Sequence, residues 1–328
     1  MAACWMAAAL MAVAGAGGAS GQEAAGYEPV TIENCGMTTT YEAPPERAVA
    51  LDQNLTEMML ALGLEDQIVG FSRSHYSQEH LVPPEYEEAY DELNLLTEVD
   101  LPSKELLLSV EPDFVIGAFD SAFSEQRGVS RETLEDLGIH TYLLSDQCQS
   151  ETIPVTFEQI HQDVRNVARI FGVEGRAEAL IGDIEAQLAD VKAGVEALDL
   201  PKVKVFVYDS GLDAPFSVGG TGSSNLVIEA AGGENIFRDV QDQFVDVSWE
   251  EVLERNPDVI LIMDYFASDP PDVSAQKDVL IQRLGGEQPV TAIEEDRVLA
   301  LPLIGFFPSI RNADTVQAVA EFLYPDLG

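Results

Sequence analysis

One pattern occurs twice in this chain, once in each half, and it limits the possible folds more than any other feature. In the first half, a segment with helical spacing around Glu105 leads to a Pro-Asp pair at 112–113 and then to an apolar run. In the second half, a similar segment around Glu250 leads to a Pro-Asp pair at 257–258 and another apolar run. A repeated helix–strand unit of this kind predicts two lobes with the same order of elements.

Apolar runs typical of buried strands alternate with segments of helical spacing along most of the chain. The strand candidates are residues 48–51, 67–71, 113–119, 140–144, 202–208, 258–263 and 297–301. The helix candidates are residues 56–62, 105–110, 131–137, 225–231, 250–254 and 314–323. Because parallel strands need a crossover that is usually a helix, this alternation predicts an α/β fold with mostly parallel sheets.

The segment between the halves, residues 155–198, has helical spacing and no strand pattern. Gly172 and Gly175 divide it into a shorter and a longer helix. At 1.5 Å per residue the longer helix is about 35 Å long, which is enough to bridge two lobes and stiff enough to allow only small movements between them. The predicted domains are a first lobe at 23–153, a helical linker at 154–200 and a second lobe at 201–328.

The N-terminal residues have the pattern of a secretory signal peptide, which we predict at residues 1–22. Residues 5–16 are an apolar run, small residues such as Ala16 and Ser20 lie at its end and after it, and the first charged residue is Glu23. A membrane-spanning helix is the alternative, but it needs ~20 apolar residues and this run is shorter. The signal predicts an exported protein, periplasmic or associated with the cell surface.

Without the leader the chain keeps two cysteines, Cys35 and Cys148. An even pair in an exported protein predicts a disulfide, and two unpaired buried thiols are the alternative. The bond would close a loop of about 114 residues, for which the chain-entropy model gives ~4 to 5 kcal/mol of stabilisation.

The charge of the chain excludes several kinds of partner. It has 58 Asp and Glu against 17 Lys and Arg, a formal net charge of -41. Because such a surface repels phosphate, nucleic acid and anionic membranes are poor partners.

The two halves differ by an insertion in the first lobe. The two Pro-Asp pairs are 145 residues apart. A second match, between the helix end at Gly63 and the helix end at Gly232, is 169 residues apart. The difference corresponds to residues 72–96, a polar stretch that includes Arg73, His75 and Tyr76. Irregular segments beyond the carboxyl end of a strand are where α/β folds place ligand contacts, and a solvated loop is the alternative.

An ordered set of features resembles a known family. Residues 45–51 (Pro-Glu-Arg-Ala-Val-Ala-Leu) run into a helical pattern at 56–63, and the last helix starts with Arg-Asn-Ala at 311–313. With the two Pro-Asp units and the long middle helix, they resemble the extracytoplasmic solute-binding proteins of ABC importers for ferric siderophores, haem and cobalamin. The resemblance implies two Rossmann-like lobes, with mostly parallel sheets, that face each other across a shallow cleft and are joined by a single long α-helix. It also implies a monomer without a resident cofactor that delivers its ligand to a permease dimer and its ATPase subunits.

Ligands in such folds bind at the carboxyl ends of strands, and these ends offer polar and aromatic side chains. The first lobe contributes Gln53, Asn54, Arg73, His75, Tyr76, Phe119 and Asp120; the second contributes Ser210, Phe216, Trp249, Tyr265, Phe266, Phe306, Phe307 and Arg311. Aromatic faces suit a bulky, partly apolar chelate, and core packing is the alternative for each ring.

The charges at these strand ends favour one class of ligand. A ferric tris-catecholate carries about three negative charges and needs several arginines, whereas only Arg73 and Arg311 are present. We therefore expect a ferric siderophore that is neutral or cationic, such as a hydroxamate complex, with Arg311 holding its oxygens. Haem, with His75, Tyr76 or Tyr265 as axial ligand, and cobalamin are the alternatives.

Glu105 and Glu250 are the predicted contacts with the permease. In the family one acidic residue on each lobe meets basic pockets of the two permease subunits, and these two positions match that pattern. The alternative is local, because each acid lies two residues after a serine and favours the first turn of a helix.

Enzyme and metal-binding motifs are weak. The Gly-rich stretch at 219–224 lacks the lysine of a phosphate-binding loop. The sequence also contains no G-x-S-x-G elbow after a predicted strand, so a secreted hydrolase is only an alternative. The four histidines at 75, 80, 140 and 161 are spread over different elements, and this spacing does not predict a metal site.

Overall fold

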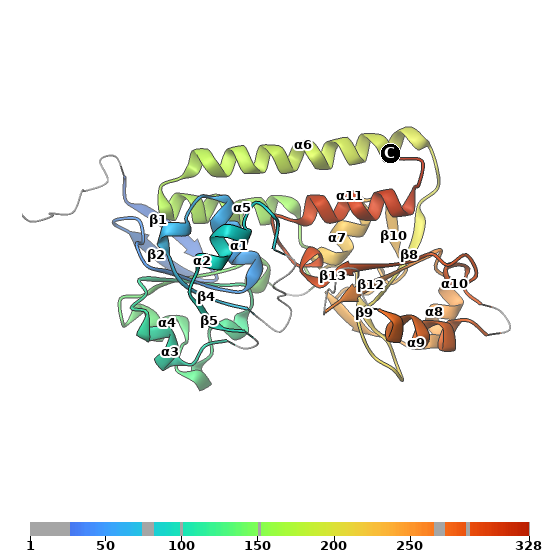
Figure 1. The fold of residues 1–328 in the computed structure, drawn as a ribbon, viewed down its shortest axis with the longest axis horizontal. Coiled ribbons are helices and arrows are strands. Elements are labelled where there is room, and N and C mark those ends of the chain that lie inside the picture. The colour runs from blue at the N-terminus through green and yellow to red at the C-terminus, as the bar shows by residue number, and fades with distance from the viewer. Residues whose placement is uncertain are drawn as a thin grey trace, which may run out of the picture.

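The computed structural model describes residues 27–73, 82–98, 101–149, 152–265, 273–286 and 289–327. Two lobes lie side by side, and one long helix, α6 (Glu174–Leu198), runs along both (Figure 1). The predicted signal peptide lies outside the described residues. Within those ranges, no helix has the length and apolar character needed to cross a membrane.

The first lobe is built on a five-stranded parallel sheet with the strand order β5-β4-β3-β6-β7. Its strands are β3 (Ala48–Leu51), β4 (Ile68–Ser72), β5 (Leu95–Thr97), β6 (Phe114–Gly117) and β7 (His140–Leu143), and its helices are α1 (Gln53–Ala61), α2 (Glu87–Glu92), α3 (Lys104–Ser109) and α4 (Arg131–Glu135). Ala48 and Ala50 of β3 belong to one apolar cluster, and Val49 and Leu51 to another. The central strand is therefore buried on both faces, as its continuous apolar run predicts.

The second lobe has a four-stranded parallel sheet with the order β10-β8-β12-β13. Its strands are β8 (Val203–Tyr208), β10 (Gly233–Asn235), β12 (Val259–Asp264) and β13 (Val298–Pro302), and its helices are α7 (Ser223–Ala230), α8 (Trp249–Arg255), α9 (Ser274–Leu284), α10 (Thr291–Glu294) and α11 (Asn312–Leu323). Two antiparallel pairs complete the fold: β1 (Val30–Asn34) with β2 (Met37–Tyr41), and β9 (Phe216–Val218) with β11 (Phe244–Asp246).

The predicted α/β fold with two parallel sheets and a long helix is confirmed, and all seven strand candidates lie on strands. The short strands and the β1–β2 hairpin were not predicted. β10, for example, reads Gly-Glu-Asn and has no apolar run that could identify it as a strand.

The repeated Pro-Asp pair has a structural role in both lobes. The Asp113 carboxylate accepts hydrogen bonds from the backbone N–H groups of Glu46 and Arg47, at 2.9 Å each. The Asp258 carboxylate accepts one from the backbone N–H of Lys204, also at 2.9 Å. Each aspartate therefore joins the start of its own strand to the start of the neighbouring central strand, which explains why the pattern recurs.

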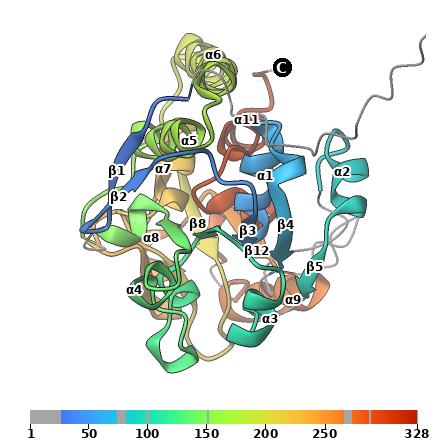
Figure 2. The same ribbon diagram turned by 90° about the vertical axis from the view of Figure 1, so that its left-hand side faces the viewer.

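The predicted linker contains two helices that pack into the lobes. α5 (Phe157–Phe171) ends at Gly172, whose φ of 70° is the left-handed conformation that glycine adopts at low cost. Val164 and Val167 of α5 are fully buried in the first-lobe core. Viewed toward the first lobe, α5 and α6 lie above its sheet and α3 and α4 below it (Figure 2).

α6 belongs to both lobes. Ala177 and Ile181, in its first half, are part of the first-lobe core, whereas Val191, in its second half, is part of the second-lobe core. Gln187 lies between them and donates hydrogen bonds to Asp314 and Gln317 of α11. The helix is therefore packed along its length and does not act as a free spacer.

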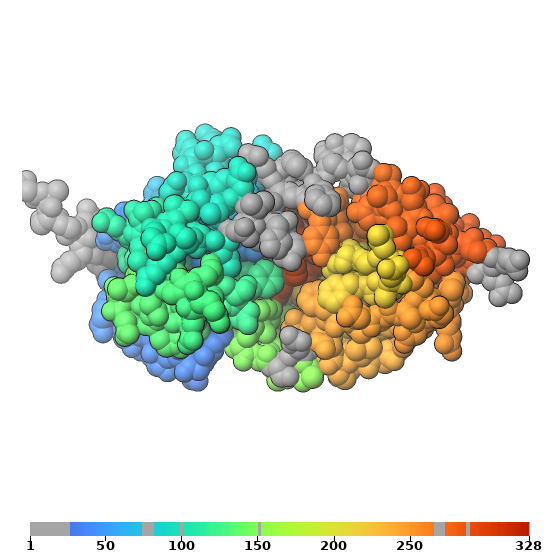
Figure 3. All heavy atoms as spheres, turned by 90° about the horizontal axis from the view of Figure 1, so that it is seen from below, coloured from blue at the N-terminus to red at the C-terminus, as the bar shows by residue number. Residues whose placement is uncertain are grey.

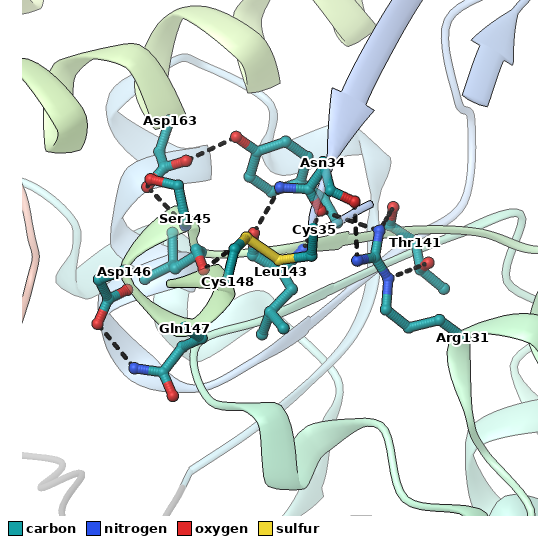
Figure 4. Close-up of a disulfide and its surroundings, with 12 residues drawn as sticks. Asn34, Cys35, Arg131, Thr141, Leu143, Ser145, Asp146, Gln147, Cys148 and Asp163 are labelled. Carbon is teal, nitrogen blue, oxygen red and sulfur yellow. Dashed lines mark hydrogen bonds between the residues drawn. A yellow bond between two sulfur atoms is a disulfide. The ribbon is translucent and has the colours of Figure 1, made fainter. Parts of the chain in front are cut away.

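The predicted disulfide between Cys35 and Cys148 is confirmed, with the two Cα atoms 4.7 Å apart (Figure 4). Cys35 lies in the turn of the β1–β2 hairpin. Next to it, the Asn34 side chain donates to the carbonyl of Leu143 at 2.8 Å and accepts from its N–H at 2.9 Å. Arg131 donates to the Asn34 carbonyl at 3.1 Å and to its side-chain oxygen at 2.9 Å. The bond and this network fix the hairpin to the edge of the first-lobe sheet.

Candidate functional site

A cavity of about 1200 Å³ lies between the two lobes. In the view from below, it lies where the teal and green first lobe meets the yellow and orange second lobe (Figure 3). Its lining consists of Leu51, Asp52, Leu101 and residues 119–127 from the first lobe, and Asp209, Phe216, Phe244, Tyr265 and Phe307 from the second. These residues follow the carboxyl ends of strands or lie on the short β9–β11 pair, the edge where α/β folds bind ligands.

Two pairs of aromatic rings form the apolar part of the lining. Phe119 of the first lobe and Phe307 of the second meet edge to face, with ring centroids 5.3 Å apart and an interplanar angle of 82°. Phe216 and Phe244 are stacked at 5.6 Å and 12°. The first pair joins the lobes, and the second gives a flat apolar surface on the second-lobe side.

Most of the charged groups of the lining are acidic. Carboxylates come from Asp52, Asp120, Glu125 and Asp209, and among the lining residues that the structure describes only Arg127 is basic. The Arg127 guanidinium donates to the backbone carbonyls of Pro102, Ser121 and Ala122, at 3.3, 2.7 and 2.8 Å. It therefore holds the 119–127 segment in shape, and burial lowers its pKa.

Asp209 is the most enclosed of these acids. Only 4% of its surface is exposed, and the Tyr265 hydroxyl donates to its Oδ1 at 2.7 Å. Burial raises the pKa of the Asp209 carboxyl, and the hydrogen bond from Tyr265 opposes the shift. The pair places a carboxylate and a phenol side by side on the second-lobe wall.

Outside the lining of the cavity, an ion pair joins the lobes. Arg311 donates through Nε to Glu57 Oε2 at 2.6 Å and through a terminal nitrogen to Glu57 Oε1. The Glu57 side chain is fully buried and that of Arg311 is 16% exposed. Burial raises the pKa of Glu57, and the hydrogen bonds from Arg311 and Gln53 oppose the shift.

Three predicted ligand contacts take part in this junction and do not line the cavity. Gln53 donates to Glu57 Oε1 at 2.8 Å, and Asn54 donates to the carbonyl of Pro308 at 3.0 Å. Arg311 is engaged by Glu57, because a buried guanidinium requires a counter-charge. Asn54 and Arg311 therefore join the lobes directly, whereas Gln53 holds the Glu57 carboxylate from within α1.

The other predicted ligand contacts lie in different parts of the structure. Phe119, Asp120, Phe216, Tyr265 and Phe307 line the cavity. Trp249 and Phe306 do not, because both are buried in the second-lobe core; the indole N–H of Trp249 donates to the carbonyl of Leu212 at 3.2 Å.

Arg73 lies over the ring of Phe71, at 5.8 Å from its centroid, and is not part of the lining. His75, Tyr76 and Phe266 lie outside the described residues.

Glu105 and Glu250 are exposed residues in the first turns of α3 and α8. Ser103 and Ser248 cap these helices, and Glu251 completes a capping box with Ser248. Hydrogen bonds from the helix N-terminus lower the pKa of Glu105. Among the residues that the structure describes, neither acid is within ion-pair distance of a basic side chain, and the capping box is formed by Ser248 and Glu251 without Glu250.

Sequence reasoning missed several lining residues. Asp52 and Asp209 directly follow β3 and β8, the equivalent central strands of the two lobes, and this shared position is a signal that could have identified them. Phe244 had no such signal, because it lies on the three-residue strand β11.

The ion pair supports a prediction about stability. Removing one partner of a buried pair leaves an uncompensated charge, which costs ~3 to 5 kcal/mol. We expect Arg311→Ala to lower the free energy of unfolding by about this amount in urea denaturation. Arg283→Ala is the control, because Arg283 forms an exposed pair with Asp213 that is worth ~1 kcal/mol or less. Equal losses in the two variants would contradict a structural role for the buried pair.

Comparison with known proteins agrees with this geometry. The family model described as periplasmic binding protein matches residues 49–303. An uncharacterized ABC transporter substrate-binding lipoprotein of Bacillus subtilis is 24% identical over 303 residues, covering 91% of this chain and 86% of the relative. A vitamin B12-binding protein of Vibrio parahaemolyticus is 23% identical over 231 residues, covering 70% of this chain and 75% of the relative.

Two solved structures share the whole architecture. A periplasmic binding protein from Veillonella parvula has a TM-score of 0.78 and 28% identity, covering 90% of this chain and 98% of that chain. An ABC-type Fe³⁺-hydroxamate transport system from Saccharomonospora viridis has a TM-score of 0.75 and 26% identity, covering 90% and 99%. The resemblance inferred from the sequence is thereby confirmed.

Proposed function

The chain belongs to the periplasmic binding protein family, as the substrate-binding protein of an ABC importer, and we propose that its substrate is a ferric siderophore of the hydroxamate type. In this proposal the ligand binds in the 1200 Å³ cavity between the lobes and is delivered to the permease. The protein acts outside the cytoplasm, in the periplasm or at the cell surface.

The charge of the lining carries the proposal. Four carboxylates and one arginine, which is engaged by three backbone carbonyls, give a negative field in the cavity. A tris-catecholate complex with about three negative charges would meet repulsion and lack the arginines that anion recognition needs. A neutral or cationic trihydroxamate complex meets no such repulsion, and its apolar linkers suit the surface of Phe216 and Phe244.

The volume of the cavity also suits a second candidate ligand, cobalamin. The cavity exceeds the ~300 to 1,000 Å³ of ordinary small-molecule sites. Cobalamin is large, polar and without a strong anionic charge, and one relative is named as a vitamin B12-binding protein. Haem is disfavoured, because its carboxylates would meet the acidic lining and because the Tyr265 hydroxyl already donates to Asp209.

We predict selective binding in calorimetric titrations. The purified protein should bind a cationic ferric trihydroxamate and show no heat of binding with a ferric tris-catecholate, while cyanocobalamin and haemin test the alternatives. Asp209→Asn should weaken the trihydroxamate about tenfold, or ~1.4 kcal/mol, because it removes a charge near the ligand. Asp213→Asn is the control, because Asp213 is fully exposed and outside the cavity. Tight binding of the tris-catecholate, or of cobalamin alone, would overturn the siderophore assignment.

We propose that Glu105 and Glu250 dock the protein on the permease. Both acids are exposed and occupy equivalent positions in the two lobes. Two equivalent charges suit a partner with two similar subunits. We expect the double change Glu105→Ala and Glu250→Ala to abolish the stimulation of ATP hydrolysis by the reconstituted transporter and to leave ligand affinity unchanged.

Glu132 provides a matched control for this double variant. It is also an exposed acid in a first helical turn, two residues after the capping Ser130. Glu132→Ala should therefore stimulate the transporter normally. Normal stimulation by the double variant would assign Glu105 and Glu250 to helix capping alone.

A further inference from the structure

A histidine and two glutamates meet where α5 packs against α6. Glu158 and His161 lie three residues apart in the first turns of α5, on one face of the helix. Glu185 lies near the middle of α6. One ligand atom of each side chain lies within 4.8 Å of those of the other two, and His161 Nδ1 is 3.4 Å from Glu185 Oε1.

We propose that Glu158, His161 and Glu185 form a binding site for Zn²⁺ that joins α5 to α6. Imidazole nitrogen with carboxylate oxygen is a donor set that zinc accepts with three protein ligands and one water. Two ligands of a tetrahedral zinc, each ~2.0 to 2.1 Å from the metal, lie about 3.3 Å apart, close to the separation of His161 and Glu185. Ca²⁺ and Mg²⁺ prefer sites made of oxygen alone.

The burial of the three side chains suits a site that is held in place and accessible. The His161 side chain is only 4% exposed, and its ring stacks on Phe157 with centroids 6.5 Å apart. The packing fixes the direction of the ring. The side chains of Glu158 and Glu185 are 71% and 57% exposed, so an ion reaches them from solvent.

Arg165 is the group that competes with a metal for Glu158. It donates to Glu158 Oε1 at 3.1 Å, and it also donates to both oxygens of Glu178, at 2.9 and 3.4 Å. Because Glu178 alone can hold the guanidinium, Glu158 is able to turn to the metal without leaving Arg165 unpaired. Among the described residues, the contact with Arg165 involves only Oε1 of Glu158, so its second oxygen is available to a metal.

The location gives the site a mechanical consequence. Phe157, one residue before Glu158, packs against the second-lobe core, although α5 is otherwise part of the first lobe. Glu185 lies on α6 between Ile181, in the first-lobe core, and Leu188, which packs against the second. Zinc bound to these three side chains would connect α5 to α6 close to where both helices contact the second lobe. Because the ion binds only the folded protein, it would raise the temperature of thermal unfolding.

A titration of the full-length protein with Zn²⁺ tests the proposal. After chelator treatment, in the presence of millimolar Mg²⁺ to occupy the acidic surface, we expect one equivalent of Zn²⁺ to bind and to raise the midpoint of thermal unfolding. Glu185→Gln should weaken binding by at least ~10-fold, because even the partners of metal ligands contribute ~10 to 100-fold. Glu196→Gln, another exposed acid of α6, should bind zinc as the unmodified protein does.

Two results of the zinc titration would overturn the site. One is zinc binding without defined stoichiometry that Mg²⁺ displaces, which indicates a diffuse effect of the acidic surface. The other is equal zinc affinity in Glu185→Gln and Glu196→Gln. As a second readout, Co²⁺ should give the visible absorption of a low-coordinate nitrogen–oxygen site, and His161→Gln should remove it. A Co²⁺ spectrum that His161→Gln leaves unchanged would also contradict the proposal.

Discussion

The buried ion pair between Glu57 and Arg311 fixes the position of one lobe relative to the other. The Asn54–Pro308 hydrogen bond and the Phe119–Phe307 ring contact also join the two lobes. Lobe separation at this point would break a charge pair that is enclosed by protein, which is costly. α6 also holds the lobes in one arrangement, because its two halves pack into the apolar cores of different lobes. The cavity is therefore formed before a ligand arrives.

A preformed cavity makes its lining the main determinant of what binds. The two equivalent central strands, β3 and β8, are each followed directly by an aspartate that lines the cavity, so both lobes place a carboxylate at the same position. Asp120 and Glu125 add to this field, and Arg127 is used to shape its own segment. The aromatic pairs contribute apolar area at little entropic cost. Shape and charge together favour a bulky ligand that is neutral or positive.

Much of the architecture could be predicted because it depends on local patterns. Continuous apolar runs identified the central strands, helical spacing identified α6, and an even number of cysteines identified the disulfide.

The predicted site residues that lie outside the cavity depend on partners that are distant in sequence. Glu57 and Arg311 are 254 residues apart, and no local pattern connects them, so the sequence alone does not reveal that Arg311 pairs with Glu57. Trp249 and Phe306 follow strand ends or start helices, as ligand contacts do, but their rings turn into the core. Conversely, His161 appeared isolated because its two acidic neighbours become neighbours only when α5 and α6 pack together.

With the ion pair and α6 both joining the lobes, we expect the lobes to keep one arrangement when the ligand binds. The most direct test is the distance between spin labels attached at Leu137 and Leu253, exposed residues of the first and second lobes, measured by pulsed electron resonance. A rigid junction predicts that a saturating ferric trihydroxamate changes this distance by less than ~1 Å, as in preorganised complexes. A closure of more than ~2 Å would contradict the claim and would show that the ion pair and α6 permit a hinge motion.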